Sequence, residues 1–357
     1  RYCPNPTRIL MPIKQDRQII GYENVALLVG DAPAYIPESN SGDSLSFLPL
    51  VQSINFSFNV ERKNASAIGS KNIIDSSNRN APDVNFNINT LEDFGVLFSS
   101  MFEDENFIGD SNLDKNFYAI IGDKKGYDVS GENLSERDFL SFGNCFLENV
   151  SISQSINGLM NSEYSFVGSN VQAQQLIQNG NIFSGRCPAI NLTGDQSQGL
   201  NVEFGNMTGY YSNKPIKIIP AYSTSVTISG NNSIGNFLIE SDCIQNFNLN
   251  IPINKKAIYS LGKKYPVFRK TLFPNIGKFD FSNKVSTFEV GGDRANLKDF
   301  LNTDENYTLM VSGSDFSSEG FLLKITDAKL DSQDISSSIS EEIVSNLSFS
   351  CLAFFST

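Results

Sequence analysis

The side chains that most often carry out chemistry in proteins are scarce in this chain. It contains no histidine, which is the commonest general acid or base at neutral pH and the usual partner of a serine or cysteine nucleophile. Paired carboxylates could hydrolyse glycosides, but Glu61, Glu92 and Glu148 lie in no recognisable motif, and there is no tryptophan to stack on sugars. We therefore expect a protein that is not an enzyme, with no catalytic residue and no cofactor.

The cysteines do not suggest a metal site either. There are five, an odd number, and none are in a Cys-x-x-Cys spacing. Neither a zinc site nor a disulfide framework is indicated by that distribution. We expect reduced thiols that pack in the interior, at Cys3, Cys145, Cys187, Cys243 and Cys351.

Length and composition predict two folded domains that do not bind nucleic acid tightly. A chain of 357 residues is about twice the commonest domain size. With 40% hydrophobic and 18% charged residues it is too apolar for disorder. A formal charge of −12 disfavours phosphate binding, which depends on clustered Lys and Arg. The aliphatic stretch 25–29 is far shorter than the roughly 20 residues of a membrane helix, and no leader opens the sequence, so we expect no membrane contact.

An internal repeat is the strongest pattern in the sequence. Residues 51–71 align without a gap to residues 244–264. Identical residues pair Gln52 with Gln245, Asn55 with Asn248, Lys63 with Lys256, Gly69 with Gly262 and Lys71 with Lys264. Each segment alternates apolar with polar residues, which predicts a strand with one buried face. The apolar positions are Ile54, Phe56, Phe58 and Val60 in the first segment and Phe247, Leu249, Ile251 and Ile253 in the second.

Further correspondences follow in the same order along the chain. A short helix is predicted at Leu91, Asp93 and Phe94 and again at Leu297, Asp299 and Phe300. Strand 116–121 then matches 306–311, and Asn149, Val150 and Ile152 match Asp327, Ala328 and Leu330. We expect a mainly β protein with two tandem copies of a β-sandwich or barrel, each with a short helix, over residues 1–185 and 186–357.

The order of these elements resembles the phage tail tube family. Two segments carry the resemblance: 50–69, where Gln-Ser-Ile-Asn-Phe-Ser-Phe runs into a basic loop, and 150–168, where Ser-Ile-Ser-Gln-Ser-Ile-Asn-Gly indicates a hairpin. The resemblance implies rings of six tube domains, an inner β-barrel that lines a channel, and rings that stack into a tube through which the genome passes. Two fused domains imply three chains in a pseudo-hexameric ring. The chain would then be a major tail tube subunit in the virion, made in the host cytoplasm, with itself and other tail proteins as partners and no specific DNA binding.

The resemblance also implies that the loop after the repeated strand stacks on the next ring. In the second copy this loop is basic and aromatic, and we expect it to dock on an acidic surface of the neighbouring ring. The basic residues are Lys255, Lys256, Lys263, Lys264, Arg269 and Lys270; the acidic candidates are Asp327, Asp331, Asp334, Glu341 and Glu342. A solvated loop and a nucleic-acid patch are the alternatives for the same residues.

The hairpins at 150–166 and 330–349 would form the barrel, with a Ser and Asn face toward the channel, although an ordinary sandwich hairpin has the same alternation. Other functions fit the sequence as well. They are another tube-fold component, such as a tail terminator, baseplate hub or injection-machine tube; a tandem β-sandwich surface-binding module; and a carbohydrate-active enzyme.

Overall fold

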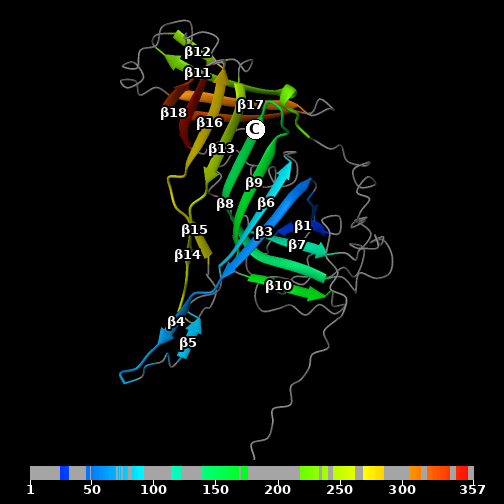
Figure 1. The fold of residues 1–357 in the computed structure, drawn as a ribbon, viewed down its shortest axis with the longest axis vertical. Helices are drawn as coiled ribbons and strands as arrows, with labels where there is room; N and C mark the ends of the chain where they lie inside the picture. Colours follow the sequence, from blue (N-terminus) through cyan, green and yellow to red (C-terminus); the bar gives the residue numbers. More distant parts are fainter. Residues whose placement is uncertain are drawn as a thin grey trace, which may run out of the picture.

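The computed structural model shows a mainly β protein, as predicted. It describes residues 25–31, 46–48, 50–69, 71, 73, 75–78, 83–91, 114–121, 138–168, 170–175, 218–232, 235–239, 244–261, 268–284, 306–314, 320–337 and 343–352. Within them the strands run from β1 to β19, and the described helix is a single 3₁₀ turn, Ala221–Ser223. All paired strands are antiparallel (Figure 1).

The first unit is built from ten strands. Four strands lie in the order β3-β6-β9-β8. The first part of β8 pairs with β7 on one side and with β10 on the other, and β7 is followed across the sheet by β1 and β2. The small sheet β4-β5 forms an arm that extends β3 and β6 (Figure 1). The bounds are β1 Val25–Asp31, β2 Ser46–Phe47, β3 Val51–Asn59, β4 Arg62–Ala65, β5 Asp75–Asn78, β6 Asp83–Leu91, β7 Asp114–Ile121, β8 Asp138–Ser155, β9 Asn161–Gly168 and β10 Asn170–Gln175.

The second unit has nearly the same strand order. Strands β13-β16-β19-β18 repeat the first four, the first part of β18 continues into β17, β11 and β12, and β14-β15 is a second arm. The bounds are β11 Thr224–Asn232, β12 Gly235–Ile239, β13 Ile244–Pro252, β14 Lys255–Ile258, β15 Phe268–Thr271, β16 Ile276–Lys284, β17 Tyr307–Ser314, β18 Gly320–Ser336 and β19 Val344–Leu352.

Strand register aligns the two units residue by residue. In β3 and in β13 a bulge shifts the register after the first residue, at Gln52 and at Gln245, as the gap-free alignment of the two segments requires. A row of directly opposed apolar residues crosses each four-stranded part. The rows are Phe56, Phe86, Phe166 and Leu147 in the first unit, and Leu249, Phe279, Phe349 and Leu330 in the second.

Apart from Phe56, which is exposed, and Leu330, which is partly buried, the residues of these rows belong to the hydrophobic core. The Phe86 ring on β6 stacks on Phe142 of β8 with centroids 4.2 Å apart and lies 5.0 Å from Phe117 of β7, so the core of the first unit joins these three strands. In the second unit the rings of Phe281 and Phe349 stack at 5.9 Å. Burial of these large apolar side chains is the main stabilising contribution to each unit.

Several sequence expectations need correction. Leu91, expected in a helix, is the last residue of β6, because it continues the ladder opposite Asn161 of β9. The other residues of both predicted helices, and the predicted boundary near residue 185, lie outside the described residues. The match of Asn149 with Asp327 is wrong: the rows align Leu147 with Leu330, and therefore Asn149 with Ser332.

Candidate assembly surface

The two units are joined by a strand pair rather than by loose contact. The second part of β8 pairs antiparallel with β13, with Ile152 opposite Leu249 and Val150 opposite Ile251. All four of these side chains are almost fully buried. One sheet therefore crosses the chain in the order β3-β6-β9-β8-β13-β16-β19-β18 (Figure 1).

The outer edges of this sheet carry exposed apolar side chains. Within the described residues, β3 pairs only with β6, and the last part of β18 pairs only with β19. Phe58 on β3 is 63% exposed and Ile335 on β18 is 54% exposed. The sequence predicted that Phe56 and Phe58 would be buried; they are exposed because β3 is an edge strand with nothing described beyond it. Such edges are places where another chain can add a strand.

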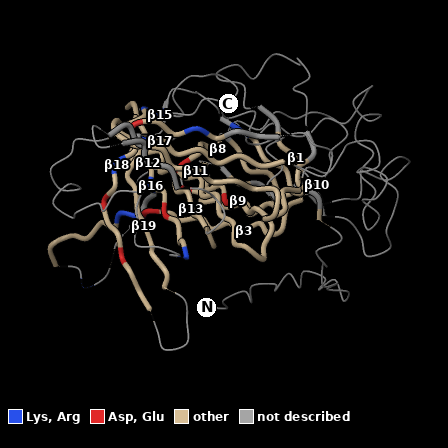
Figure 2. Tube along the Cα trace, turned by 90° about the horizontal axis from the view of Figure 1, so that it is seen from above, with Lys and Arg blue, Asp and Glu red and all other residues tan. Residues whose placement is uncertain are grey.

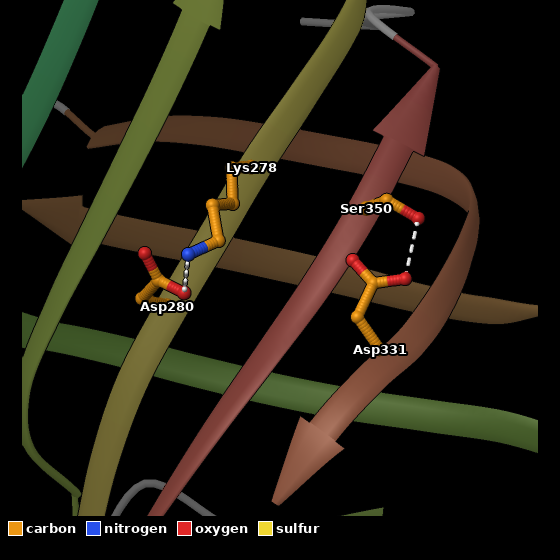
Figure 3. Close-up of polar contacts among 4 residues, drawn as sticks. All are labelled: Lys278, Asp280, Asp331 and Ser350. Atoms are coloured by element: carbon orange, nitrogen blue, oxygen red, sulfur yellow. Dashed lines mark hydrogen bonds and ion pairs between the residues drawn. The ribbon is translucent and has the colours of Figure 1, made fainter.

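The opposite face of the sheet is polar and nearly neutral. Rows of directly opposed residues cross it: Asn55, Asn87, Ser165 and Asn149 in the first unit, and Asn248, Asp280, Ser348 and Ser332 in the second. Asp280 is paired with Lys278, whose Nζ lies 3.3 Å from the carboxylate (Figure 3). Figure 2 shows how few charged positions the strands carry.

The basic residues of the second arm fall into two groups. Lys255 and Arg269 lie over the ring of Phe146 on β8, with Nζ 5.4 Å and the guanidinium carbon 4.8 Å from its centroid. Lys256 and Lys270 are opposite one another on β14 and β15 and are exposed. Lys263 and Lys264 lie outside the described residues. This arm thus docks on the first unit of its own chain through a contact that sequence reasoning missed, since Phe146 lies in no motif.

The acidic candidates lie along β18. Asp331 occupies the bulge of this strand and accepts a hydrogen bond from Ser350 Oγ at 3.1 Å (Figure 3). Asp327 has a positive φ of 58° and accepts a hydrogen bond from Asn306 Nδ2. Asp334 is exposed opposite Asn346, and Glu341 and Glu342 lie outside the described residues.

The ends of the sheet differ in character. Both arms leave at one end, after Asn59 of β3 and after Pro252 of β13. The β8–β9 turn lies at the other end, because Asn161 is opposite both Leu91 and Ser153. Fully exposed aliphatic residues occupy matching places in the arms, Ile68 and Leu261, while Ile156, Leu159 and Tyr222 are exposed near the turn.

The Cys351 thiol is kept protonated by its surroundings. Burial and, secondarily, the nearby Asp331 carboxylate raise its pKa to about 12. Cys145 is also a buried free thiol, which fits the expected packing role of both residues.

Comparisons with known proteins give only distant structural matches. No protein-family model matches the chain, and no curated protein matches its sequence. Among solved structures, the tail of an empty GTA particle with C6 symmetry is 11% identical, covering 37% of this chain and 93% of that one, with a TM-score of 0.27. The SPP1 tail tube is 12% identical (44% and 81% covered, TM-score 0.32) and the anti-feeding prophage baseplate 10% identical (38% and 89%, TM-score 0.27).

Scores this low identify no family. No helix in the described part of the chain has the length and apolar character needed to cross a bilayer.

Proposed function

We propose that this chain is a virion structural protein, the major tail tube subunit of a tailed phage, and not an enzyme. The observation that carries the proposal is the β8–β13 pair, which joins two units of like topology into one sheet. Repetition of this junction between chains would extend the sheet. The extended sheet closes into a ring when the rotations that relate each chain to the next add up to a full turn.

Two repeated domains per chain, 1–185 and 186–357, give a ring of six domains from three chains. This stoichiometry comes from the resemblance noted in the sequence. The matching bulges at Gln52 and Gln245 support the repeat, because bulges are specific features of a strand and not products of alternation alone.

Stacking of rings needs head-to-tail contact between unlike surfaces, which generates an open filament. The two sheet ends provide unlike surfaces: arms with apolar tips on one and the β8–β9 turn with Ile156 and Leu159 on the other. The exposed Lys256 and Lys270, with Lys263 and Lys264, remain candidates for contact with Asp327, Glu341 and Glu342 of the next ring. Asp331 and Asp334, the other two acidic candidates, lie on the edge part of β18, where a neighbour in the same ring would meet them.

The Asn and Ser face would line the channel. Amide and hydroxyl groups with few charges offer no cluster of Lys and Arg to hold phosphates, so DNA could pass without specific binding. Localisation in the phage tail and contact with other tail proteins follow from this assignment.

Negative-stain electron microscopy and sedimentation of the purified chain test the proposal. Hollow tubes built from rings of three chains are expected. Single rings that do not stack would instead favour a tail terminator or another tube-fold component. Monomers at all concentrations would refute self-assembly and favour a tandem β-sandwich binding module.

A further inference from the structure

The internal junction gives the register in which a second copy would meet the free edges. In the junction, Leu249 is opposite Ile152, five residues beyond Leu147 along β8. Leu147 corresponds to Leu330, because each is the last residue of its apolar row. Five residues beyond Leu330 along β18 is Ile335, which therefore corresponds to Ile152. Phe56 of β3 corresponds to Leu249 of β13, because each begins the apolar row of its unit.

Exposure differs sharply between the corresponding positions. Ile335 is 54% exposed, whereas its counterpart Ile152 is 1% exposed. Phe58 is 63% exposed, whereas its counterpart Ile251 is fully buried. Three of the four residues that seal the internal junction therefore have apolar counterparts on the free edges, Phe56 and Phe58 on β3 and Ile335 on β18, with nothing described to cover them. The counterpart of the fourth, Val150, is Gln333.

We propose that β18 of one copy pairs antiparallel with β3 of a second copy, with Phe56 opposite Ile335 and Ser57 opposite Asp334. This inference rests on the proposed function and specifies the surface by which its rings close. The partner is a second copy because the pairing repeats a junction that the chain already contains.

The polar contacts of the internal junction also have counterparts at this surface. Ser151 Oγ donates to Asn248 Oδ1 at 3.1 Å, and these positions become Asp334 and Asn55, whose amide Nδ2 can donate to the carboxylate. The Ile253 N–H donates to the Glu148 carbonyl at 2.7 Å. The corresponding residues at the proposed surface are Val60 and Asp331. In this register the first contact keeps a side-chain donor and acceptor, and the second keeps a backbone donor and acceptor.

The pairing is heterologous, so each edge can be blocked separately. Phe58→Lys places a charge on the β3 edge and Ile335→Lys places one on the β18 edge; lysine on an edge strand opposes strand addition. Each variant alone should be monomeric at the concentration where wild type assembles. Its own concentration for half-maximal assembly should be at least tenfold higher than that of wild type. In an equimolar mixture, the intact β18 edge of the Phe58→Lys chain can still pair with the intact β3 edge of the Ile335→Lys chain. Both remaining edges of that pair are blocked, so sedimentation should show heterodimers and nothing larger. Ile276→Lys is the matched control, since Ile276 is 52% exposed but lies on β16, between β13 and β19.

Circular dichroism of each variant establishes that it is folded. Assembly by Phe58→Lys or Ile335→Lys at the wild-type concentration would overturn the pairing while leaving the proposed function in place. Failure of two folded variants to form heterodimers, when wild type assembles, would do the same. Wild-type protein that never assembles would overturn the proposed function, and the pairing with it.

Cysteine cross-linking tests the register independently of assembly strength. Ser57→Cys combined with Asp334→Cys should give disulfide-linked multimers on oxidation of assembled protein. Ser57→Cys combined with Gln333→Cys should not, because adjacent residues of a strand point to opposite faces. Equal cross-linking of the two pairs would overturn the register, and the single-cysteine variants control for the native thiols.

Discussion

Arg269 lies over Phe146, its guanidinium carbon 4.8 Å from the ring centroid, so the second arm is held against the first unit. Lys255 shares the same ring at 5.4 Å. A cation over an aromatic face contributes about 0.5–2 kcal/mol, depending on its exposure. The arm is thus part of the contact between the units.

Phe146→Leu should remove this cation–π attraction while keeping an apolar side chain. We expect the free energy of unfolding in urea to fall by about 1 kcal/mol and amide exchange in β14 and β15 to speed up. Phe146→Tyr keeps the aromatic face and is the control. Unchanged exchange in β14 and β15 of Phe146→Leu would show that the ring does not hold the arm.

Salt should affect the contact between chains more than the contact within a chain. At the proposed surface, Arg62 occupies the position that corresponds to Lys255, and Lys329 occupies the position that corresponds to Phe146. Asp331 lies two residues beyond Lys329 on β18 and is the carboxylate that Arg62 would meet. Arg62→Glu and Asp331→Arg should each weaken ring closure about threefold at low salt, and the double variant should recover it, as for an exposed ion pair. Sedimentation across a salt series measures this, and additive losses in the double variant would exclude the pair.

The arm tips should govern stacking rather than ring closure. Ile68→Asp with Leu261→Asp places charges where two fully exposed aliphatic residues occupy matching positions. We expect single rings in place of tubes by electron microscopy. Ile276→Asp, which changes an exposed residue of β16 outside the arm loops, is the control; tubes of normal length in the double variant would assign stacking to other residues.

Alkaline pH should destabilise the fold through Cys351. Its pKa rises from an ordinary value of 9.0 to about 12 in the folded chain, so the folded state retains a proton that the unfolded state releases. The stabilisation is complete below about pH 9 and is lost as pH rises toward 12, at up to about 1.4 kcal/mol per pH unit. Urea unfolding of wild type and Cys351→Ala between pH 8 and 10.5 measures this, and equal slopes would contradict it.

A glycine on β16 makes room for the same thiol. A Cβ added at Gly277 would lie 3.1 Å from Cys351 Sγ, so Gly277→Ala should cost about 1–2 kcal/mol of stability. Combining it with Cys351→Ala should recover part of that loss, since the crowding atom is gone. A double-mutant cycle by chemical denaturation gives the coupling, and a coupling near zero would show that the backbone adjusts instead.

Alternation predicted the strands well because a side-chain period of two follows directly from strand geometry. The hairpins at 150–166 and 330–349 and the strands at the start of the repeated segments 51–71 and 244–264 were found in this way. Alternation could not fix the alignment of β8 with β18, since each contains a bulge that shifts the register, at Glu148 and at Asp331.

The pairing of strands that are far apart in the sequence could not be predicted. Nothing in the pattern of Ile152 or Leu249 shows that they are opposite one another, because any two half-buried strands can present such residues. The exposure of Phe58 has the same origin: its pattern is that of a buried position, and only the sheet order makes it an edge. The arm residues were chosen for their charge, which does not show that Lys255 and Arg269 turn back toward Phe146.

The β8–β13 pair also affects how readily rings would form. Because both strands belong to one polypeptide, that pairing is intramolecular and proceeds at the high effective concentration of tethered partners. A ring of six domains would then need two associations between molecules instead of five, and each association saved avoids a loss of translational and rotational entropy of about 4–15 kcal/mol. Fusion of the two units would in this way lower the concentration at which the first ring nucleates.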